Sequence, residues 1–580
     1  MAALDTGGEV KERAWISSIK MGEDVWFVAL SIGRLPMSLK SLPIPPIPEE
    51  VVRVAHAVFP RGNVFMQVRD ALGTIYTDEA FADLFPTHGQ PAFAPWRLAL
   101  VTIFQFLEGL TDRQAADAVR DRLAWKYALS LELTDAGFDH TVLSEFRARL
   151  VEGKAEQRLL DLLLERCREG GWLKAHGRQR TDSTHILAKI RSLSRTLRVA
   201  QTMVYVLNVL SEVAPDWIRS HVPVEWVERY GQRLEEERLP KEEQERMQYA
   251  NQVGAAGWML LDALQAPCAP DWMKTLPAVT TLRTMWEQQF EAQEQGGQWR
   301  KEPALPATQL IASPYDLDAR NGKKRSTFWT GYKVHFTQTC DEDAPQLITS
   351  VQTTAAPLSD EGVVSAIHAD LAEKELLPDQ HLVDSGYVTI TNLVQSQSDY
   401  EVDLLGPTLK THWYQAETGY DLTHFSIDWE AETVTCPQGR TSSSWTPVQE
   451  ANKSLIKVKF SSSDCKVCPS RTLCTGTTRR SMTLHPKEQM QALFAARGRE
   501  RTDAFKEAYR HRAGIEGTHS QGVRAMGLRR SRYIGLRKTH LGHVAVAAAV
   551  TVIQLMSYLR GEAPEQTRTS PFHRLMKPAG

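Results

Sequence analysis

Two acidic residues stand out because each is alone in a strongly basic stretch. Asp182 is the only acid between 174 and 198, and Glu516 is the only acid from 508 to 538. Lysine and arginine neutralise nucleic-acid phosphates, so a carboxylate among them repels DNA unless it holds a metal ion. Taken singly, either acid could equally form a salt bridge to a neighbouring arginine. The two stretches are therefore candidate sites for metal-assisted phosphate chemistry.

A third acid, Asp384, follows a short apolar strand and precedes Gly386. Ligand-binding residues collect at the carboxyl ends of strands in α/β sheets, although an Asp in this setting is often only a turn residue. Three carboxylates brought together repel one another by roughly 4 kcal/mol per pair at 4 Å. Two divalent cations and a scissile phosphate would neutralise them, so the set favours two-metal phosphoryl chemistry.

The elements that must position these acids read as a mixture of strands and helices. The segment 180–186 is rich in β-branched residues, and Tyr332, Val334 and Phe336 alternate with polar residues. Further strands are expected at 346–353, 381–383 and 401–405, with a helical stretch over 359–376 and a long helical insertion at 195–300. This pattern predicts an α/β class.

Length and charge limit the alternatives. The 580 residues suggest about four structural units, and the formal charge of −2 means that any attraction to a polyanion is local. With 42% apolar and 24% charged residues, the chain is not collagen-like, wholly disordered or only a coiled coil. The sequence contains no G-x-S-x-G elbow, H-E-x-x-H helix or P-loop, and no convincing tyrosine-recombinase set.

The region before the first strand is helical. Apolar residues recur at helical spacing from Pro95 to Gly109 and predict a first helix. Thr111 and Gln114 fit a capping box at the start of a second helix, and a third over about 141–151 carries Arg147 and Arg149. Three short helices with exposed arginines could form a helix-turn-helix DNA reader or an ordinary packing domain. Near the other end, the apolar run 544–556 is too short and too interrupted to cross a bilayer, so we expect a buried helix. No secretory signal is apparent, which favours the cytoplasm.

Four of the seven cysteines gather between 436 and 474. They are Cys436, Cys465, Cys468 and Cys474, with the spacing C-x28-C-x2-C-x5-C. In a reducing compartment this spacing favours metal ligation and resembles a four-cysteine zinc ribbon holding a structural Zn²⁺. The alternative is four reduced cysteines in a small β insertion.

Together these segments resemble the DDE transposases of bacterial insertion sequences, in the subgroup called IS Eleven-eighty-two. The resemblance runs from about Met37 and rests on the helical region 93–150 and the motifs around Asp182, Tyr332 and Asp384, together with 509–522. The family's third-acid signature is Tyr-x2-Arg-x3-Glu-x6-Lys. Tyr509, Arg512 and Glu516 match it, whereas the lysine position holds Val523 with Arg524 beside it.

The resemblance implies a ribonuclease-H-like catalytic core in which Asp182, Asp384 and Glu516 hold two Mg²⁺ (or Mn²⁺) ions. It implies an enzyme that hydrolyses phosphodiester bonds at the ends of the element and transfers the freed 3′-hydroxyl to target DNA. The partners would be double-stranded DNA, as terminal inverted repeats and target, and a second copy of the chain in a homodimer. The expected DNA-contacting residues are Tyr509, Arg512, Arg524, Arg529, Arg530, Arg178, Arg180 and Lys333.

The expected domain order begins with an extension and Pro-rich linker, of which residues 1–36 lie outside the resemblance. The ranges are 1–48 for this segment, 49–165 for a helical DNA-binding domain, 170–410 for the first part of the core, 411–490 for the Cys-rich insertion, 491–562 for the last part of the core and 563–580 for a tail. The competing function is a catalytically inactive or domesticated relative that binds DNA as a regulator.

Overall fold

The structure is a computed structural model, and the residues it describes make up most of the chain. They are 15–20, 26–31, 37–232, 234–293, 296–409, 418–450 and 453–562, together with 572 and 575. Most of the expected extension 1–36, and the expected tail 563–580 apart from two residues, lie outside the described residues. The described part of the extension is a hairpin of β1 (Trp15–Lys20) and β2 (Trp26–Ser31).

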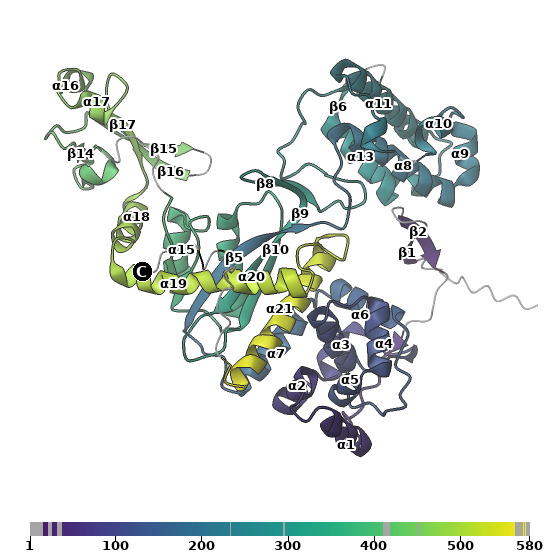
Figure 1. The fold of residues 1–580 in the computed structure, drawn as a ribbon. Helices are drawn as coiled ribbons and strands as arrows, with labels where there is room; N and C mark the ends of the chain where they lie inside the picture. Colours follow the sequence, from purple (N-terminus) through teal and green to yellow (C-terminus); the bar gives the residue numbers. More distant parts are fainter. Residues whose placement is uncertain are drawn as a thin grey trace, which may run out of the picture.

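A mixed sheet forms the centre of the molecule, as the α/β prediction requires (Figure 1). Its strands lie in the order β10-β9-β5-β11-β12, with β8 also paired to β9. Strands β5, β9 and β10 are antiparallel neighbours, as are β8 and β9, whereas β11 and β12 run parallel to β5. The bounds are β5 (Arg178–Leu187), β8 (Arg320–Lys324), β9 (Thr327–Thr339), β10 (Ile348–Ala355), β11 (Gln380–Leu382) and β12 (Asp403–Leu405).

Strand β9 is buried on both faces. The alternating apolar residues Tyr332, Val334 and Phe336 are fully buried, as the alternation predicted. The intervening His335 and Thr337 are buried as well, because other elements cover the second face. The helices that contact the sheet are α14 (Val364–Glu373), α15 (Ile390–Tyr400), α20 (Gly514–Ala525) and α21 (Leu536–Leu559).

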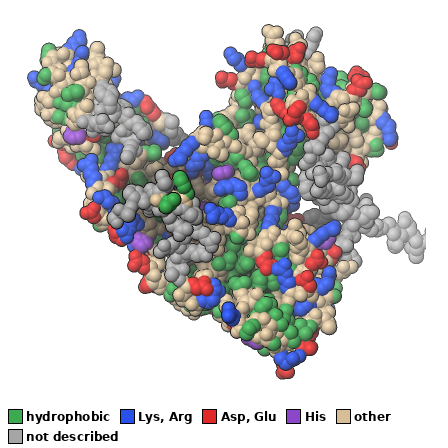
Figure 2. Space-filling view, in the orientation of Figure 1, with side chains coloured by type: hydrophobic (Ala, Val, Ile, Leu, Met, Phe, Trp, Pro, Cys, Tyr) green, Lys and Arg blue, Asp and Glu red, His purple; other side chains and the backbone are tan. Residues whose placement is uncertain are grey.

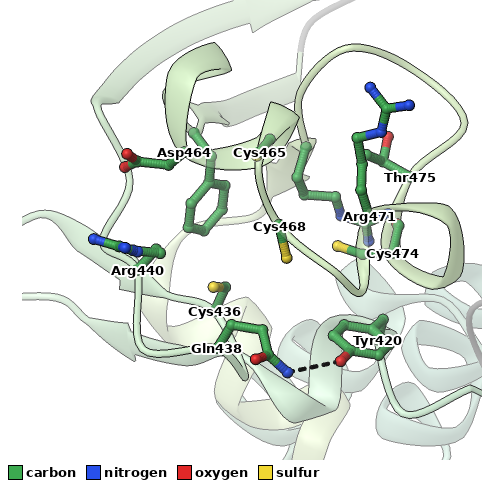
Figure 3. Close-up of a pocket in the computed structure, with 12 residues that line it drawn as sticks. Tyr420, Cys436, Gln438, Arg440, Asp464, Cys465, Cys468, Arg471, Cys474 and Thr475 are labelled. Carbon is green, nitrogen blue, oxygen red and sulfur yellow. Dashed lines mark hydrogen bonds between the residues drawn. The ribbon is translucent and has the colours of Figure 1, made fainter.

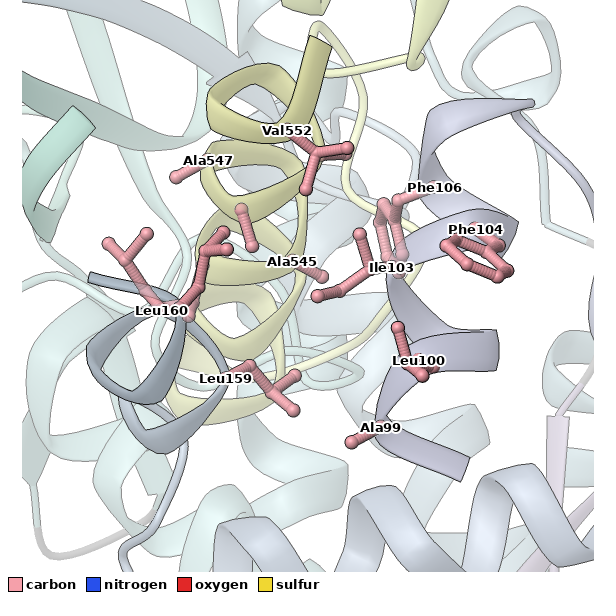
Figure 4. Packing of buried hydrophobic residues seen from close by; sticks show 14 of the residues in the cluster. Ala99, Leu100, Ile103, Phe104, Phe106, Leu159, Leu160, Ala545, Ala547 and Val552 are labelled. Atoms are coloured by element: carbon pink, nitrogen blue, oxygen red, sulfur yellow. The ribbon is translucent and has the colours of Figure 1, made fainter. Parts of the chain in front are cut away.

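Helix α21 joins the sheet to the N-terminal helices. It packs against β10 on one side and against α3 and α7 on another, and one hydrophobic core runs from Val51 to Met556 through these contacts (Figure 4). The prediction of a buried helix at 544–556 is confirmed. Within the described residues, α21 alone is long and apolar enough to span a membrane, but 78% of its most apolar window is buried in this core.

The N-terminal helices pack as part of the same core. They are α1 (Glu49–Val58), α2 (Val64–Leu72), α3 (Pro95–Leu107), α4 (Asp112–Asp121), α5 (Leu123–Ala128), α6 (Thr141–Glu152) and α7 (Arg158–Glu169). The capping box of Thr111 and Gln114 is confirmed at the start of α4. The expectation that Arg147 is exposed is wrong, because it is ion-paired at 2.5 Å to Asp112 and only 7% exposed.

Two further units have cores of their own. The first spans the expected helical insertion and is built on α8 (Arg195–Val213), α11 (Glu243–Gln265) and α13 (Pro277–Gln289). The second lies within 418–484 and consists of small sheets around Phe425, Val458 and Phe460. Its strands are β13 (Ser426–Asp428), β14 (Thr433–Thr435), β15 (Ser444–Glu450), β16 (Lys453–Lys459) and β17 (Ser481–Leu484). Figure 1 shows the two units on opposite sides of the central sheet.

The chain returns from the second unit to the sheet through two helices, α18 (Lys487–Arg499) and α19 (Asp503–Arg510). A single 3-10 turn, η6 (His511–Ala513), then joins α19 to α20. Helix α20 contacts β5, so the residues at the start of α20 are brought over the strand that carries Asp182. This connection joins acids separated by more than three hundred residues in sequence.

Candidate active site

Asp182 lies in the middle of β5, the central strand of the sheet. It pairs in register with Phe336 of β9, and its Oδ1 accepts a hydrogen bond of 2.8 Å from the backbone N–H of Ser183. Burial raises the pKa of Asp182 to about 6, even though Arg512 and the Ser183 N–H favour the charged form. Burial thus disfavours the charged form of the Asp182 carboxyl group, as is typical of acids in functional sites.

Asp384 lies beside Asp182 because of the parallel pairing of β11 with β5. Leu382 of β11 is in register with Arg180 of β5. Two residues further on, Asp384 and Asp182 therefore lie at the same level of the sheet. The Oδ1 of Asp384 accepts a 2.7 Å hydrogen bond from the N–H of Gly386. This is the turn geometry that the local sequence favoured, and it leaves Oδ2 of Asp384 3.9 Å from Nη2 of Arg512.

Glu516 lies in the first turn of α20 and is the most accessible of the three acids, with its side chain 67% exposed. The helix is anchored to β5 at two points. His519 donates from Nε2 to the carbonyl of Asp182 at 3.1 Å, and Arg180 donates to the carbonyl of His511 at 2.6 Å. These anchors hold the third acid over the first.

The three acids converge on one guanidinium, that of Arg512. Its Nη2 lies 2.7 Å from Asp182 Oδ2 and 3.9 Å from Asp384 Oδ2, and its Nη1 lies 2.9 Å from Glu516 Oε1. Burial lowers the pKa of Arg512, but the surrounding carboxylates and Tyr509 outweigh this effect and raise it. The structure thus brings the predicted triad together around a shared positive charge.

The donor set of this cluster suits a hard divalent cation. Three carboxylates already share one positive charge, and oxygen ligands of this kind are those that Mg²⁺ and Mn²⁺ prefer. Among the residues that the structure describes, no three His, Cys, Asp or Glu side chains are gathered as a group that would hold an ion as they stand. In the triad, the Arg512 guanidinium lies between the acids.

The residues expected to contact DNA fall into different environments. Arg524 and Arg530 are exposed. Arg529 is half-buried and donates to Thr184 Oγ1 at 3.1 Å and to the carbonyl of His185 at 2.5 Å. Tyr509 is half-buried, and its ring is stacked on Phe505 with the ring centroids 5.5 Å apart. Arg524 lies in the last turn of α20, and Arg530 follows that helix in the chain.

Two of the expected DNA contacts from the sheet are bonded within the protein, and a third lies near an acid. Arg180 is only 3% exposed, and its guanidinium donates to Gln338, Gln346 and the His511 carbonyl, so the expectation that it contacts DNA conflicts with its burial. Lys333 donates to Asp360 at 2.9 Å. Arg178 Nε lies 3.7 Å from Asp341.

A polar network beside the triad was not anticipated from the sequence. Asp360 forms the ion pair with Lys333, and both side chains are 13% exposed. His335 Nδ1 and the hydroxyl of Tyr387 form a hydrogen bond of 2.8 Å in the buried layer below. Lys333 follows Tyr332 in the alternating strand, and Tyr387 lies three residues after Asp384, but Asp360 follows a loop rather than a strand, so its position carried no signal.

The four clustered cysteines line one pocket in the 418–484 unit (Figure 3). Cys465 comes from α16 (Ser462–Lys466) and Cys474 from α17 (Arg471–Cys474), whereas Cys436 follows β14. Burial raises the pKa of the Cys474 thiol, and the other three cysteines raise it further while Arg480 opposes them. The four residues, up to 38 positions apart in sequence, thus line the same pocket, although no three of them are gathered as a group that would hold an ion as they stand.

The acids, the sheet that carries them and the surrounding arginines define a candidate enzyme that acts on phosphodiesters. Comparison with protein families agrees with this class: residues 435–556 match the model of a transposase DDE domain, and residues 53–149 match that of a transposase domain (DUF772). These matches support an insertion-sequence transposase of the DDE type. The first match includes Arg512, Glu516 and the four cysteines, but neither Asp182 nor Asp384. No curated protein matches the chain.

Proposed function

We propose that the chain is a Mg²⁺- or Mn²⁺-dependent DDE transposase of the IS Eleven-eighty-two subgroup, with Asp182, Asp384 and Glu516 as its catalytic acids. One observation supports the assignment above the others. Acids from a central strand, the end of its neighbour and a late helix all lie within 4 Å of the guanidinium of Arg512. An unrelated set of salt bridges would not be expected to select these three positions from a chain with 70 acidic residues.

We further propose that the sheet is a ribonuclease-H-like core. Strands β5, β9 and β10 are antiparallel neighbours, and they are followed in the chain by β11 and β12, which run parallel to β5 at the centre of the sheet. This arrangement supports the proposal because it places the first acid on the central strand and the second acid directly after the adjacent one. The third acid then has to arrive from a helix packed against the central strand, as α20 does.

The reaction has two parts in this proposal. Water attacks the phosphorus at the end of the element, a new P–O bond forms, the P–O3′ bond breaks, and the 3′-hydroxyl is released. That hydroxyl then attacks a target phosphodiester, so one P–O3′ bond forms as another breaks. Asp182, Asp384 and Glu516 would hold divalent ions, which activate an attacking oxygen and stabilise a leaving one.

The chain's own residues would prepare this site. Arg512 keeps the three acids together before DNA arrives, and its guanidinium is then available to a backbone phosphate. Tyr509, Arg524, Arg529 and Arg530 would hold further phosphates, because Tyr509 lies in the last turn of the helix before Glu516 and the three arginines lie at the end of α20 or just after it. Double-stranded DNA, as terminal inverted repeats and target, is the proposed partner. A homodimer across paired ends and a cytoplasmic, nucleoid-associated location complete the proposal.

The proposal includes a structural Zn²⁺ held by Cys436, Cys465, Cys468 and Cys474. Support comes from the pocket that all four thiols line and from the small size of the surrounding core, which a metal would reinforce. The zinc would stabilise the 418–484 unit and take no part in the reaction.

The test is nicking and strand transfer with the purified full chain, Mg²⁺ and a duplex carrying the DNA that flanks the gene. Asp182→Asn, Asp384→Asn and Glu516→Gln should each lower the rate by more than about 100-fold while DNA binding persists. Asp379→Asn is the matched control, because this acid lies just before β11 and is exposed, whereas Asp384 lies just after it. Equal rates for the triad variants and the wild type would overturn the catalytic assignment.

The second candidate is a catalytically inactive relative that binds DNA as a regulator. The contact of all three acids with Arg512 favours it, because the same contacts would make a purely structural cluster. Binding to the flanking DNA without any Mg²⁺-dependent nicking, in the wild type and the variants alike, would select this function.

A further inference from the structure

The hairpin formed by β8 and β9 carries a large exposed aromatic residue at its tip. Lys323 pairs in register with Phe328, and Lys324 pairs with Thr327, so Arg325 and Ser326 form the turn. Alternation along β9 buries Trp329 against Gly322 and His185 but turns Phe328 outward. The Phe328 side chain is 70% exposed, whereas Trp329 is 6% exposed. The next residue along the strand therefore anchors the hairpin and leaves the Phe328 ring accessible.

The surroundings of Phe328 are basic. Lys323, Lys324 and Arg325 are all exposed, and the ammonium of Lys323 lies 4.9 Å from the centroid of the Phe328 ring. Figure 2 shows Lys and Arg side chains gathered on the middle of this face, over the strands labelled β8 and β9 in Figure 1. An exposed aromatic ring among cations differs from an apolar protein-docking patch, which is depleted in lysine.

The hairpin is anchored to the strand that carries Asp182, because the Trp329 ring lies 5.3 Å from the ring of His185, three residues after Asp182 on β5. Gly331 has a φ of +151°, and a Cβ at this position would collide with the carbonyl of Ile186, so the backbone of β9 approaches β5 closely here. Further along β9, Lys333 donates to Asp360 at 2.9 Å, and oxygens of Asp360 and Asp384 both lie within 3.5 Å of the position that a Cβ on Gly386 would take. The strand that carries Phe328 therefore continues into the surroundings of the acid cluster.

We propose that the β8–β9 hairpin binds the end of a DNA strand beside the acid cluster, with Phe328 stacked on an unpaired base and Lys323, Lys324 and Arg325 on the adjacent phosphates. This inference rests on the proposed function, since it assumes that the acids act on DNA. Enzymes that act at a DNA end need the terminal nucleotide separated from its partner, and an exposed ring supplies a stacking surface for the released base. Any base can stack on an aromatic ring, so the hairpin recognises an unpaired strand end whatever its sequence.

The experiment compares two DNA probes of the same sequence, one blunt duplex and one duplex whose last nucleotides are unpaired. Binding of each to the full chain is measured by fluorescence anisotropy in EDTA, so that no cleavage occurs. The wild type should prefer the unpaired end, and Phe328→Ala should weaken binding to that probe by about 10-fold while changing the blunt probe little. Phe328→Trp should retain the preference, and Phe328→Leu should lose it because leucine has no π-face.

Trp272→Ala is the matched control, because Trp272 is an exposed aromatic residue, 49% accessible, in the helical insertion rather than on the hairpin. Lys324→Gln should reduce the slope of log K against log salt by about 1. Retention of the preference in Phe328→Ala would overturn the proposal. Retention in Phe328→Leu would also overturn it and would indicate general apolar contact, as with a protein partner.

The outcomes separate this inference from the proposed function. If the triad variants keep wild-type nicking but Phe328→Ala loses the preference for the unpaired end, the catalytic assignment fails and the hairpin assignment survives. If the triad variants abolish nicking and Phe328→Ala binds both probes normally, only the hairpin assignment fails.

Discussion

Arg512 Nη2 lies 2.7 Å from Asp182 Oδ2, although the two residues are 330 positions apart in sequence. The contact joins the central strand of the sheet to the turn that precedes α20, and it neutralises an acid whose pKa burial raises to about 6. The same guanidinium reaches Glu516 at 2.9 Å. Arg512 therefore occupies the position at which a divalent cation would have to balance the acids.

Arg512→Gln should lower the stability of the metal-free protein and increase its response to Mg²⁺. Without the guanidinium, the three carboxylates repel one another. Because solvent screens the exposed Glu516, we expect the free energy of unfolding to fall by only about 1 to 3 kcal/mol. An added divalent cation would no longer compete with the arginine. The measurement is the thermal unfolding midpoint with EDTA and with Mg²⁺, for which the Mg²⁺-induced rise should be larger in the variant than in the wild type.

Arg512→Lys is the control because it keeps a positive charge on a shorter, single-point donor. Its Mg²⁺-induced rise should lie between those of the wild type and Arg512→Gln. An equal rise in all three proteins would show that the guanidinium does not occupy the cation position.

Arg180 and Arg530 should behave in opposite ways when replaced by glutamine. Burial lowers the pKa of Arg180 to about 10, and its donors are used by Gln338, Gln346 and the His511 carbonyl, so Arg180→Gln should destabilise the fold by about 3 kcal/mol. Arg530 is exposed, so Arg530→Gln should leave the unfolding midpoint unchanged and reduce the salt dependence of DNA binding by about one phosphate contact. Chemical denaturation and binding titrations at several salt concentrations distinguish the two effects.

The purified chain should carry about one zinc ion, held by the cysteine pocket. Cys436→Ser and Cys468→Ser should lose the metal and make the 418–484 unit sensitive to proteolysis, because its core is small. Cys268→Ser should keep the zinc, since Cys268 is an exposed cysteine of the helical insertion. Metal analysis that finds no zinc in the wild type would contradict the site.

The sequence predicts the elements of the site better than it predicts what each basic residue does. Asp182, Asp384 and Glu516 could be selected because strand ends and charge isolation are visible in a linear chain, and the structure brings them together. The burial of Arg180 could not be predicted in this way, because it depends on Gln338 and Gln346, which lie more than 150 residues away in sequence. The residue type alone does not distinguish an arginine that binds a phosphate from one whose donors are used by buried side-chain amides.

The same limit applies to the N-terminal helices. Their periodicity predicted helices and one cap correctly, since both depend on neighbours within four residues. Whether Arg147 faced solvent depended on Asp112 and on the Tyr533 ring, whose centroid lies 5.4 Å from the guanidinium. That ring comes from the far end of the chain, through the core that α21 shares with α3 and α7. The burial of Arg147 therefore could not be predicted from the residues next to it in the sequence.

The buried histidine His543 should make the fold less stable in mildly acidic solution. It lies on α21 with Nδ1 bonded to Thr353 Oγ1 at 2.8 Å, and burial lowers its pKa to about 3. Because the pKa in the unfolded chain is higher, near 6.5, the unfolded state binds the proton first as the pH falls. The contribution of neutral His543 is complete above about pH 6.5 and is lost progressively below it, by about 2 kcal/mol at pH 5.

His543→Asn tests this reasoning because the amide can keep the bond to Thr353 but does not titrate. The variant should be less stable than the wild type at pH 7 by a constant amount, from the lost ring volume. Between pH 7 and pH 5 it should lose about 2 kcal/mol less stability than the wild type, measured by denaturant titration at each pH. His88→Asn, at an exposed histidine, should follow the wild-type curve. Parallel curves for His543→Asn and the wild type would mean that His543 does not control acid stability, and would leave the other buried histidines between the sheet and its helices as the groups to examine.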